Sequence, residues 1–158
     1  MKLNLGCGQD FRINYTNIDK HPVDTKYVQY GDFTNLNLCG ISDNSVEEMV
    51  CVDGLSYIPN QKIVEVLTNW VTKMAPDGEL FIQTFDGSVL GNMMGYSQVG
   101  LEQSNEFIYG NPQDKEPRRA LYTLPYIESI LKNLKLTTVE KGISSVNFYI
   151  RAKKLVTK

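Results

Sequence analysis

The first half of the chain alternates short apolar runs with clusters of turn-forming residues. Runs of four to eight residues rich in β-branched and aromatic side chains, bounded by Gly, Asp, Asn or Ser, are typical of β-strands. This pattern predicts four strands, over Lys2 to Leu5, Tyr15 to Asp19, Lys26 to Tyr30 and Glu48 to Val52.

A helical period follows the fourth predicted strand. Apolar residues recur at spacings of three and four and form one face of an amphipathic helix, in Ile63, Leu67, Trp70, Val71 and Met74. We expect Asn60 to cap this helix and Pro76-Asp77-Gly78 to end it, because Pro lacks a donor and Gly tolerates left-handed backbone. The β-rich run from Glu79 to Phe85 is the predicted fifth strand.

The last forty residues repeat the two patterns. Thr123 is placed to cap a second helix, with Pro125 tolerated in its first turn. Its buried face is predicted to hold Ile127, Ile130, Leu131 and Leu134. Strands over Leu136 to Glu140 and Val146 to Ala152 are close enough to pair as an antiparallel hairpin. The order of elements predicts an α/β fold, with a mostly parallel sheet and an antiparallel C-terminal hairpin.

The stretch from Asp86 to Ala120 has a weaker pattern. It holds five glycines and Met93-Met94, and only Leu101 to Ile108 has a helical period. Connections of this length inside a compact domain are usually lids or binding loops. We therefore expect residues 86–120 to form a variable segment, a lid or the substrate side of a site, within a single domain that spans residues 1–158.

Composition narrows the class of protein. The chain has 158 residues, of which 42% are hydrophobic and 22% are charged, with a net charge of −2. These values fit one globular domain, and they point to neither a nucleic acid nor an anionic membrane as partner. No apolar run is long enough to span a bilayer, and we expect no signal peptide, because the first predicted strand begins at Lys2.

The small numbers of Cys and His limit which metal sites and disulfides the chain can form. The chain has three Cys, with no Cys-x-x-Cys pair, and a single His. An odd count of dispersed Cys favours free thiols in a reducing, cytoplasmic setting. One His cannot build a His-based metal cluster, so we expect no metal site.

The most informative motif lies at the start of the chain. Leu3-Asn4-Leu5 is followed by Gly6-Cys7-Gly8, and Asp19 ends the next predicted strand. Ligands of open α/β sheets bind beyond the carboxyl ends of the strands, where a glycine turn lets a ligand approach the backbone. Two glycines alone are equally compatible with a structural turn. A nicotinamide dinucleotide is disfavoured, because the third glycine is missing and a full crossover helix hardly fits before Asp19.

These segments together resemble the class I S-adenosylmethionine-dependent methyltransferases, especially their short type 11-like group. The resemblance rests on the glycine turn with Asn17-Ile18-Asp19, on Gly31-Asp32-Phe33, on Ser42 to Met49, on Leu55-Ser56-Tyr57-Ile58-Pro59, and on Met74 to Leu80. It covers roughly Lys2 to Phe85, with a looser likeness from Tyr122 onward. The chain departs from the family where Ser56-Tyr57 replaces a frequent Glu-His pair.

The resemblance implies S-adenosylmethionine as cofactor and assigns residues to it. Gly6 and Gly8 would hold its methionine and ribose portion, and Asp19 would accept both ribose hydroxyls. Asp32 would take the adenine amino group, with Phe33 beside the ring. The neighbouring positions Leu5, Cys7, Lys20 and Val52 complete the implied set. The alternatives are a solvated strand end for Asp19, a turn-forming role for Asp32 and core packing for Phe33.

Methyl transfer needs little from the protein beyond alignment and, for a hydroxyl or ammonium acceptor, a general base. Asp53, just past the fourth strand, is the predicted base, with Tyr57 nearby; the alternatives are a turn cap and a half-buried aromatic. Asp86, Arg118 and Arg119 are predicted to contact the acceptor, although an Arg pair is more often solvated. His21 is expected on the ribose side or in a surface loop. Tyr96, Phe107 and Tyr109 are expected to line an apolar acceptor pocket or to cover the core.

The function predicted from the sequence is methylation of a small-molecule acceptor. A non-catalytic module that binds the cofactor or a partner is the main alternative. A nicotinamide-linked oxidoreductase is disfavoured by the glycine turn, and a self-associating scaffold, hence a homo-oligomer, stays possible because no helix precedes the first strand.

Overall fold

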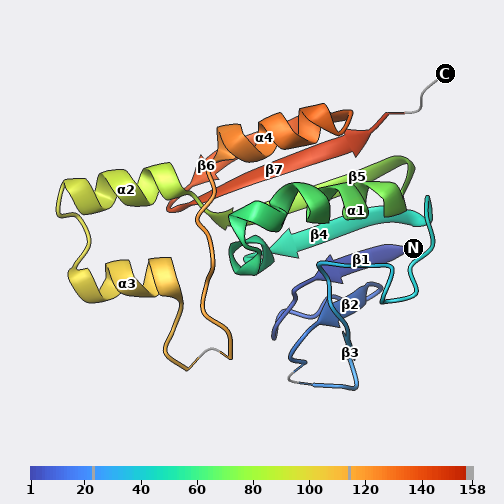
Figure 1. Cartoon of the computed structure of the whole chain (residues 1–158), viewed down its shortest axis with the longest axis horizontal. Coiled ribbons are helices and arrows are strands. Elements are labelled where there is room, and N and C mark those ends of the chain that lie inside the picture. The colour runs from blue at the N-terminus through green and yellow to red at the C-terminus, as the bar shows by residue number, and fades with distance from the viewer. Residues whose placement is uncertain (23, 114, 156–158) are drawn as a thin grey trace.

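The structure is a computed structural model that describes residues 1–22, 24–113 and 115–155. Its centre is a sheet of seven strands in the order β3-β2-β1-β4-β5-β7-β6 (Figure 1). The strands are β1 (Lys2–Leu5), β2 (Thr16–Asp19), β3 (Val28–Tyr30), β4 (Val46–Val52), β5 (Met74–Phe85), β6 (Leu136–Ser144) and β7 (Asn147–Lys154). The first five run parallel, and β7 is antiparallel to both β5 and β6. The predicted fold class is confirmed.

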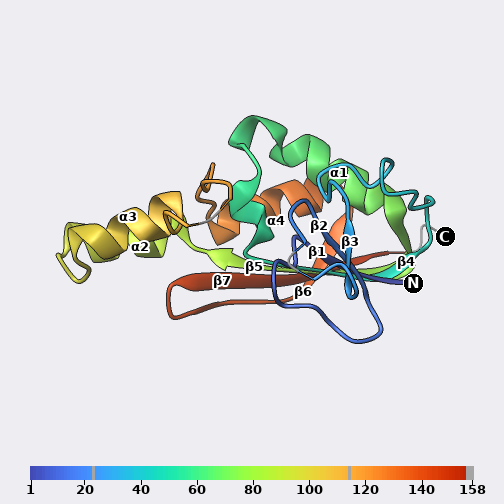
Figure 2. The ribbon, with the colours of Figure 1, turned by 90° about the horizontal axis from the view of Figure 1, so that it is seen from below.

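The helices are α1 (Ile63–Lys73), α2 (Gly87–Gly95), α3 (Leu101–Tyr109) and α4 (Leu124–Asn133), with short 3-10 turns η1 (Gly54–Tyr57) and η2 (Asn60–Lys62). Seen along the sheet, α1 and α4 lie on one face, whereas α2 and α3 extend beyond its end (Figure 2). Within the described ranges, no helix has the length and apolar character that crossing a membrane requires.

Two local predictions were wrong in detail, and one helix was not predicted. Helix α1 ends at Lys73, and Pro76-Asp77-Gly78 lies inside β5, where Met74 already pairs with Val46 and a register shift absorbs the irregular stretch. Asn60 begins η2 and does not cap α1. The sequence also gave no sign of α2, because glycines at 87, 91 and 95 lower helix propensity.

The core lies between the sheet and the layer formed by α1 and α4. Trp70 of α1 is fully buried, together with Ile82 of β5 and Phe148 of β7. The indole Nε1 of Trp70 donates a 2.7 Å hydrogen bond to the carbonyl oxygen of Phe33. This buried bond fixes the loop that follows β3 against the core, and it therefore fixes the place of the Phe33 ring.

The opposite face of the sheet has no helix in the part of the chain that the structure describes (Figure 2). Largely parallel sheets normally carry helices on both faces, but the connections from β1 to β2 and from β2 to β3 are too short here to hold one. This face carries ion pairs between neighbouring strands, which are compatible with exposure to water. Lys2 Nζ lies 2.8 Å from Glu48 Oε2, and Arg151 Nη1 lies 3.3 Å from Glu79 Oε2.

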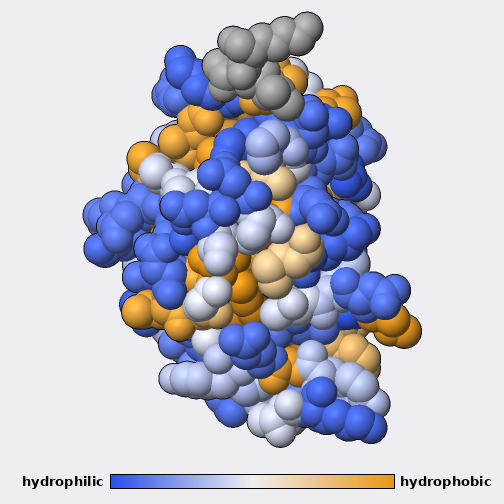
Figure 3. All heavy atoms as spheres, turned by 90° about the vertical axis from the view of Figure 1, so that its right-hand side faces the viewer, coloured by the Kyte–Doolittle hydropathy of each residue, from blue (hydrophilic) through white to orange (hydrophobic). Residues whose placement is uncertain are grey.

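The two ends of the parallel strands differ in character. Figure 3 shows the side on the right of Figure 1, where the N-terminus lies, and hydrophilic residues cover most of it, with hydrophobic residues in small groups. The carboxyl ends of β1 and β4 point the other way, toward the loops that follow them (Figure 1). Strand β6 forms one edge of the sheet and contains a bulge between Thr138 and Glu140.

Candidate cofactor site

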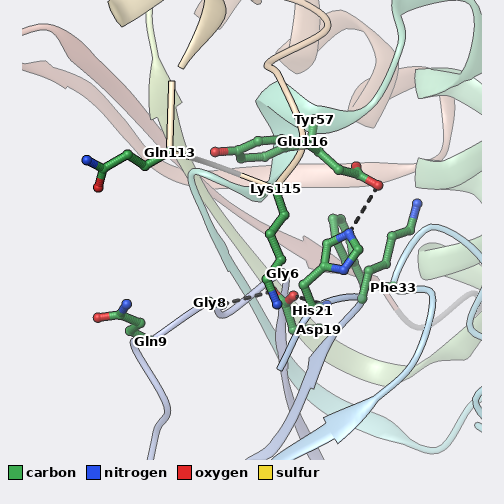
Figure 4. A pocket seen from close by; sticks show the side chains of 12 residues that line it. Gly6, Gly8, Gln9, Asp19, His21, Phe33, Tyr57, Gln113, Lys115 and Glu116 are labelled. Carbon is green, nitrogen blue, oxygen red and sulfur yellow. Dashed lines mark hydrogen bonds and ion pairs between the residues drawn. The ribbon is translucent and has the colours of Figure 1, made fainter. Parts of the chain in front are cut away.

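A cavity of about 420 Å³ lies at the carboxyl ends of β1, β2 and β4 (Figure 4). Its volume falls within the range of ligand pockets. It is lined by Gly6, Gly8, Gln9, Asp19, Lys20, His21, Phe33, Gly54, Tyr57, Gln113, Lys115 and Glu116. The N-terminal motif and the distant segment after α3 therefore meet around one space.

The glycine turn is held to β2 by hydrogen bonds that its backbone amides donate. The amide of Gly6 donates to the carbonyl of Ile18 at 2.9 Å, and the amide of Gly8 donates to Oδ2 of Asp19 at 2.9 Å. Gly6 and Gly8 have φ values of +62° and +52°, a region that favours glycine. The other oxygen of Asp19 accepts from the amide of His21 at 2.7 Å. The carboxylate thus orders the turn and the start of the next loop.

The glycines also allow a close approach between loops. A Cβ at Gly6 would lie 3.1 Å from the Phe33 ring and 3.2 Å from the Cα of Gly54, so the turn after β1 packs directly on η1. At Gly8 a Cβ would meet nothing within 4 Å, because this part of the turn borders the cavity. The packed position, Gly6, and the open position, Gly8, are therefore separated only by Cys7.

Lys20, Asp32 and Phe33 form one cluster beside the cavity. Lys20 Nζ lies 3.3 Å from Asp32 Oδ1 and 5.8 Å from the centroid of the Phe33 ring. Burial alone would raise the pKa of Asp32, but hydrogen bonds from Thr34 and the charge of Lys20 outweigh it and lower the pKa. Asp32 caps its own turn by accepting from the amide of Thr34 at 2.9 Å, and it is not among the lining residues.

Gln113, Lys115 and Glu116 line the cavity from the segment after α3, and these three residues are called the strap. His21 Nε2 lies 3.3 Å from Glu116 Oε1 and joins the strap to the loop after β2 (Figure 4). The Lys115 side chain points from the strap into the cavity (Figure 4). Sequence reasoning missed these three residues and Gln9, although it did single out the segment that carries the strap.

Asp53 follows β4 in an unusual conformation. Its φ is +57°, although it is not glycine, and its amide donates to the carbonyl of Gln83 at 2.8 Å. Its Oδ1 is buried and has no hydrogen-bond partner within the described residues. Burial raises the pKa of this carboxyl, and the charge of Arg118 opposes that effect. Asp53 precedes Gly54, which lines the cavity, but Asp53 is not itself among the lining residues.

Asp86, for which a contact with the acceptor is predicted, is buried in the structure and does not line the cavity. Only 1% of the residue is exposed. Its Oδ1 accepts from the amides of Ser88 and Val89, and its Oδ2 accepts from the amide of Leu124 at 3.1 Å. One carboxylate therefore caps both α2 and α4. It also supplies the capping bond that the Thr123 side chain does not make.

Arg118 and Arg119 do not form a clamp. Arg118 turns inward, where its guanidinium carbon lies 4.3 Å from the centroid of the Phe85 ring and Nη1 donates to the carbonyls of Glu106 and Phe107. The Arg118 guanidinium is therefore held by contacts within the protein, whereas Arg119 is exposed to solvent.

The remaining predicted residues lie around the cavity or away from it. Leu5 and Cys7 are buried beneath the glycine turn, and burial raises the pKa of the Cys7 thiol to about 12. Val52 is half-buried within the sheet beside Gln83, and Tyr57 lines the cavity. The aromatic residues expected to line an acceptor pocket, Tyr96, Phe107 and Tyr109, do not line this cavity. The ring of Phe107 packs 5.2 Å from that of Phe85, and Tyr96 and Tyr109 are exposed.

No protein-family model matches the sequence, and no curated protein matches it. Solved structures do match. A SAM-dependent methyltransferase from Methanosarcina mazei superposes with a TM-score of 0.70 at 14% identity, over 99% of this chain and 92% of that one. One from Archaeoglobus fulgidus gives 0.67 at 13% identity, over 97% and 85%. One from Thermotoga maritima, described as a possible histamine N-methyltransferase, gives 0.65 at 12% identity, over 97% and 81%.

The chain therefore has the class I S-adenosylmethionine-dependent methyltransferase fold. Identities this low show the fold, so the function has to be argued from the site. The cavity fits a cofactor of that kind in three respects. Gly8 borders open space, each Asp19 oxygen keeps a lone pair beyond its backbone bond, and the Phe33 ring offers a flat apolar surface.

Proposed function

We propose that the protein is an S-adenosylmethionine-dependent methyltransferase that acts on a small molecule. The observation that carries this proposal is the pairing of Asp19 with the glycine turn at the floor of the cavity. It places a carboxylate with free lone pairs at the carboxyl end of β2, where open α/β sheets bind nucleotide-type ligands. The likeness to solved methyltransferases supports the same conclusion.

Named residues of the cavity would hold the cofactor. Asp19 would accept hydrogen bonds from the ribose hydroxyls, and Phe33 would pack against the flat base. Gly6 and Gly8 would let the remaining portion lie close to the backbone. When bound, the cofactor supplies a methyl group that is already activated, so alignment of the acceptor is the main task of the protein.

Asp53 is the proposed general base. A buried carboxylate oxygen without a partner is costly to keep, and the left-handed backbone that presents it is strained. Such groups cluster at functional sites. The raised pKa of Asp53 brings it closer to neutrality, which suits a group that must take a proton at the pH of the cell.

Isothermal titration with S-adenosylmethionine, S-adenosylhomocysteine and NADH tests the cofactor. We expect both adenosyl compounds to bind and NADH not to bind. An absence of heat with both adenosyl compounds would refute the proposal. Turnover is then measured as formation of S-adenosylhomocysteine with pooled metabolites as acceptors. Cofactor binding without turnover in any pool would favour the non-catalytic binding module.

A further inference from the structure

The residue that the family resemblance assigns to the adenine amino group is not part of the cavity wall. Asp32 is absent from the residues that line the cavity, whereas Lys20 and Phe33 are among them. Oδ1 of Asp32 already accepts hydrogen bonds from the amide of Thr34 at 2.9 Å and from the Thr34 hydroxyl. The carboxylate therefore orders its own loop, and a different polar group faces the cavity beside the Phe33 ring.

That group is the ammonium of Lys20. Lys20 directly follows β2, and its Nζ lies 5.8 Å from the centroid of the Phe33 ring. The same Nζ lies 3.3 Å from Oδ1 of Asp32, and only 33% of the Lys20 side chain is exposed. A base that packs against Phe33 thus has an ammonium donor close to its edge.

Backbone contacts fix the ammonium and the ring relative to each other. The amide of Gly31 donates to the carbonyl of Asp19 at 3.0 Å and joins the loop after β3 to the residue before Lys20. The carbonyl of Phe33 accepts a buried 2.7 Å hydrogen bond from Nε1 of Trp70. The place where a donor meets the edge of the base is therefore built into the protein before a ligand binds.

The charge of the Lys20–Asp32 pair decides which ligand group it can bind. The two side chains together carry no net charge, so an anionic ligand group gains little Coulomb energy beside them. An ammonium has three protons and no acceptor, and the contact with Asp32 uses one of these protons. The others suit a neutral acceptor such as a ring nitrogen. An amino group donates hydrogen bonds and gains nothing from Lys20.

We propose that Lys20 recognises the base of the cofactor by donating a hydrogen bond to a ring nitrogen of adenine. Asp32 holds the ammonium in place and does not itself take the amino group. This inference rests on the proposed methyltransferase function, which supplies the adenosyl cofactor. It reverses the hydrogen bond that the resemblance implies, because the protein donates to the base where an acceptor was expected. The two assignments therefore predict opposite losses of affinity when the base is altered.

Altered bases separate a donor from an acceptor at this position. Titration calorimetry compares S-adenosylhomocysteine with an analogue that lacks the 6-amino group and with the 1-deaza, 3-deaza and 7-deaza analogues, in which carbon replaces one ring nitrogen. We expect the analogue without the amino group to bind within about threefold of the parent, and one deaza analogue to bind about tenfold more weakly. A tenfold loss without the amino group, together with parent-like binding of all three deaza analogues, would overturn the inference.

A variant assigns this effect to Lys20. Lys20→Met keeps an unbranched side chain and removes the donors, so it should bind S-adenosylhomocysteine about tenfold more weakly and should lose the discrimination against the weak deaza analogue. Lys26→Met, at an exposed lysine outside the cavity wall, is the matched control and should bind every ligand as wild type does. Circular dichroism checks that both variants fold. Discrimination as strong in Lys20→Met as in wild type would overturn the inference.

Asp32→Asn tests the positioning role of the carboxylate. It should weaken S-adenosylhomocysteine binding in wild type and have no further effect in Lys20→Met, because Asp32 acts through the ammonium. An equal loss in both backgrounds would overturn that role. No binding of S-adenosylhomocysteine to wild type would refute the proposed function, and the inference with it. Intact binding with no loss for any deaza analogue would refute the base contact alone.

Discussion

The amide of Gly8 and the carboxylate of Asp19 form a 2.9 Å hydrogen bond that ties the turn after β1 to the end of β2. The same carboxylate holds the amide of His21, where the next loop begins. Asp19 therefore shapes the floor of the cavity in the free protein. It does so with only part of its hydrogen-bonding capacity, and the rest is available to a ligand.

Asp19→Ala should weaken S-adenosylhomocysteine binding by at least about tenfold, because both the floor and the ligand lose an acceptor. The loss of two backbone partners should also lower the free energy of unfolding by about 1–3 kcal/mol. Titration calorimetry and urea unfolding measure the two effects. Asp24→Ala, which removes a turn-capping carboxylate outside the cavity, is the matched control and should leave affinity unchanged. Wild-type affinity in Asp19→Ala would mean that the ribose assignment is wrong.

Gly54→Ala should both destabilise the protein and weaken cofactor binding. The new Cβ would lie 2.8 Å from the Sγ of Cys51 and 3.2 Å from the carbonyl oxygen of Leu5, so β1 and β4 must separate at their tips. Overpacking of this kind costs about 1–3 kcal/mol. Gly91→Ala in α2 meets nothing within 4 Å and should be neutral or slightly stabilising. Thermal unfolding compares the two variants, and equal melting temperatures would contradict the close approach.

Asp53→Asn and Asp86→Asn should change the pH dependence of stability in opposite directions. The raised pKa of Asp53 makes wild type lose stability as pH rises from about 4 through the folded-state pKa, so Asp53→Asn gains relative to wild type over that range. The lowered pKa of Asp86 contributes stability above about 4 that is lost as pH falls through its folded-state pKa, so Asp86→Asn is the weaker protein at neutral pH. Urea unfolding from pH 3 to 8 measures both, and parallel curves would contradict the assignment.

Glu116→Gln should speed the release of S-adenosylhomocysteine by no more than about fivefold. The His21–Glu116 pair is partly exposed, and such pairs contribute about 0–1 kcal/mol. Stopped-flow measurements with increasing salt should accelerate release from wild type and bring it toward the variant, because salt screens exposed charges. Glu102→Gln, at an exposed position on α3, serves as control. A wild-type rate that salt does not affect would show that the His21–Glu116 pair does not slow the release of the ligand.

The sheet was predictable because its signals are local. Each parallel strand is a short apolar run that ends at a turn residue, and the terminal strands are close enough to pair. The floor of the cavity follows from the same logic, since Gly6, Gly8 and Asp19 stand at the ends of two neighbouring strands.

The upper part of the site depends on contacts that no local pattern encodes. His21 meets Glu116 across 95 residues, and the inward turn of Arg118 depends on where α3 ends. Asp86 shows a different limit. An acid at the end of a strand is equally compatible with a ligand contact and with a helix cap. Asp86 is a cap because helix α2 begins directly after it, and the glycines of α2 made that helix hard to predict from the sequence.

Strand β6 leaves one row of backbone donors and acceptors without a neighbouring strand, and an open row of this kind can recruit a strand from another molecule. The bulge between Thr138 and Glu140 breaks the regular spacing that such recruitment requires, and Lys141 adds charge to the same stretch. Deleting Val139 would restore regular spacing along this edge. The shortened protein should then form β-rich aggregates at concentrations where the intact chain stays dispersed.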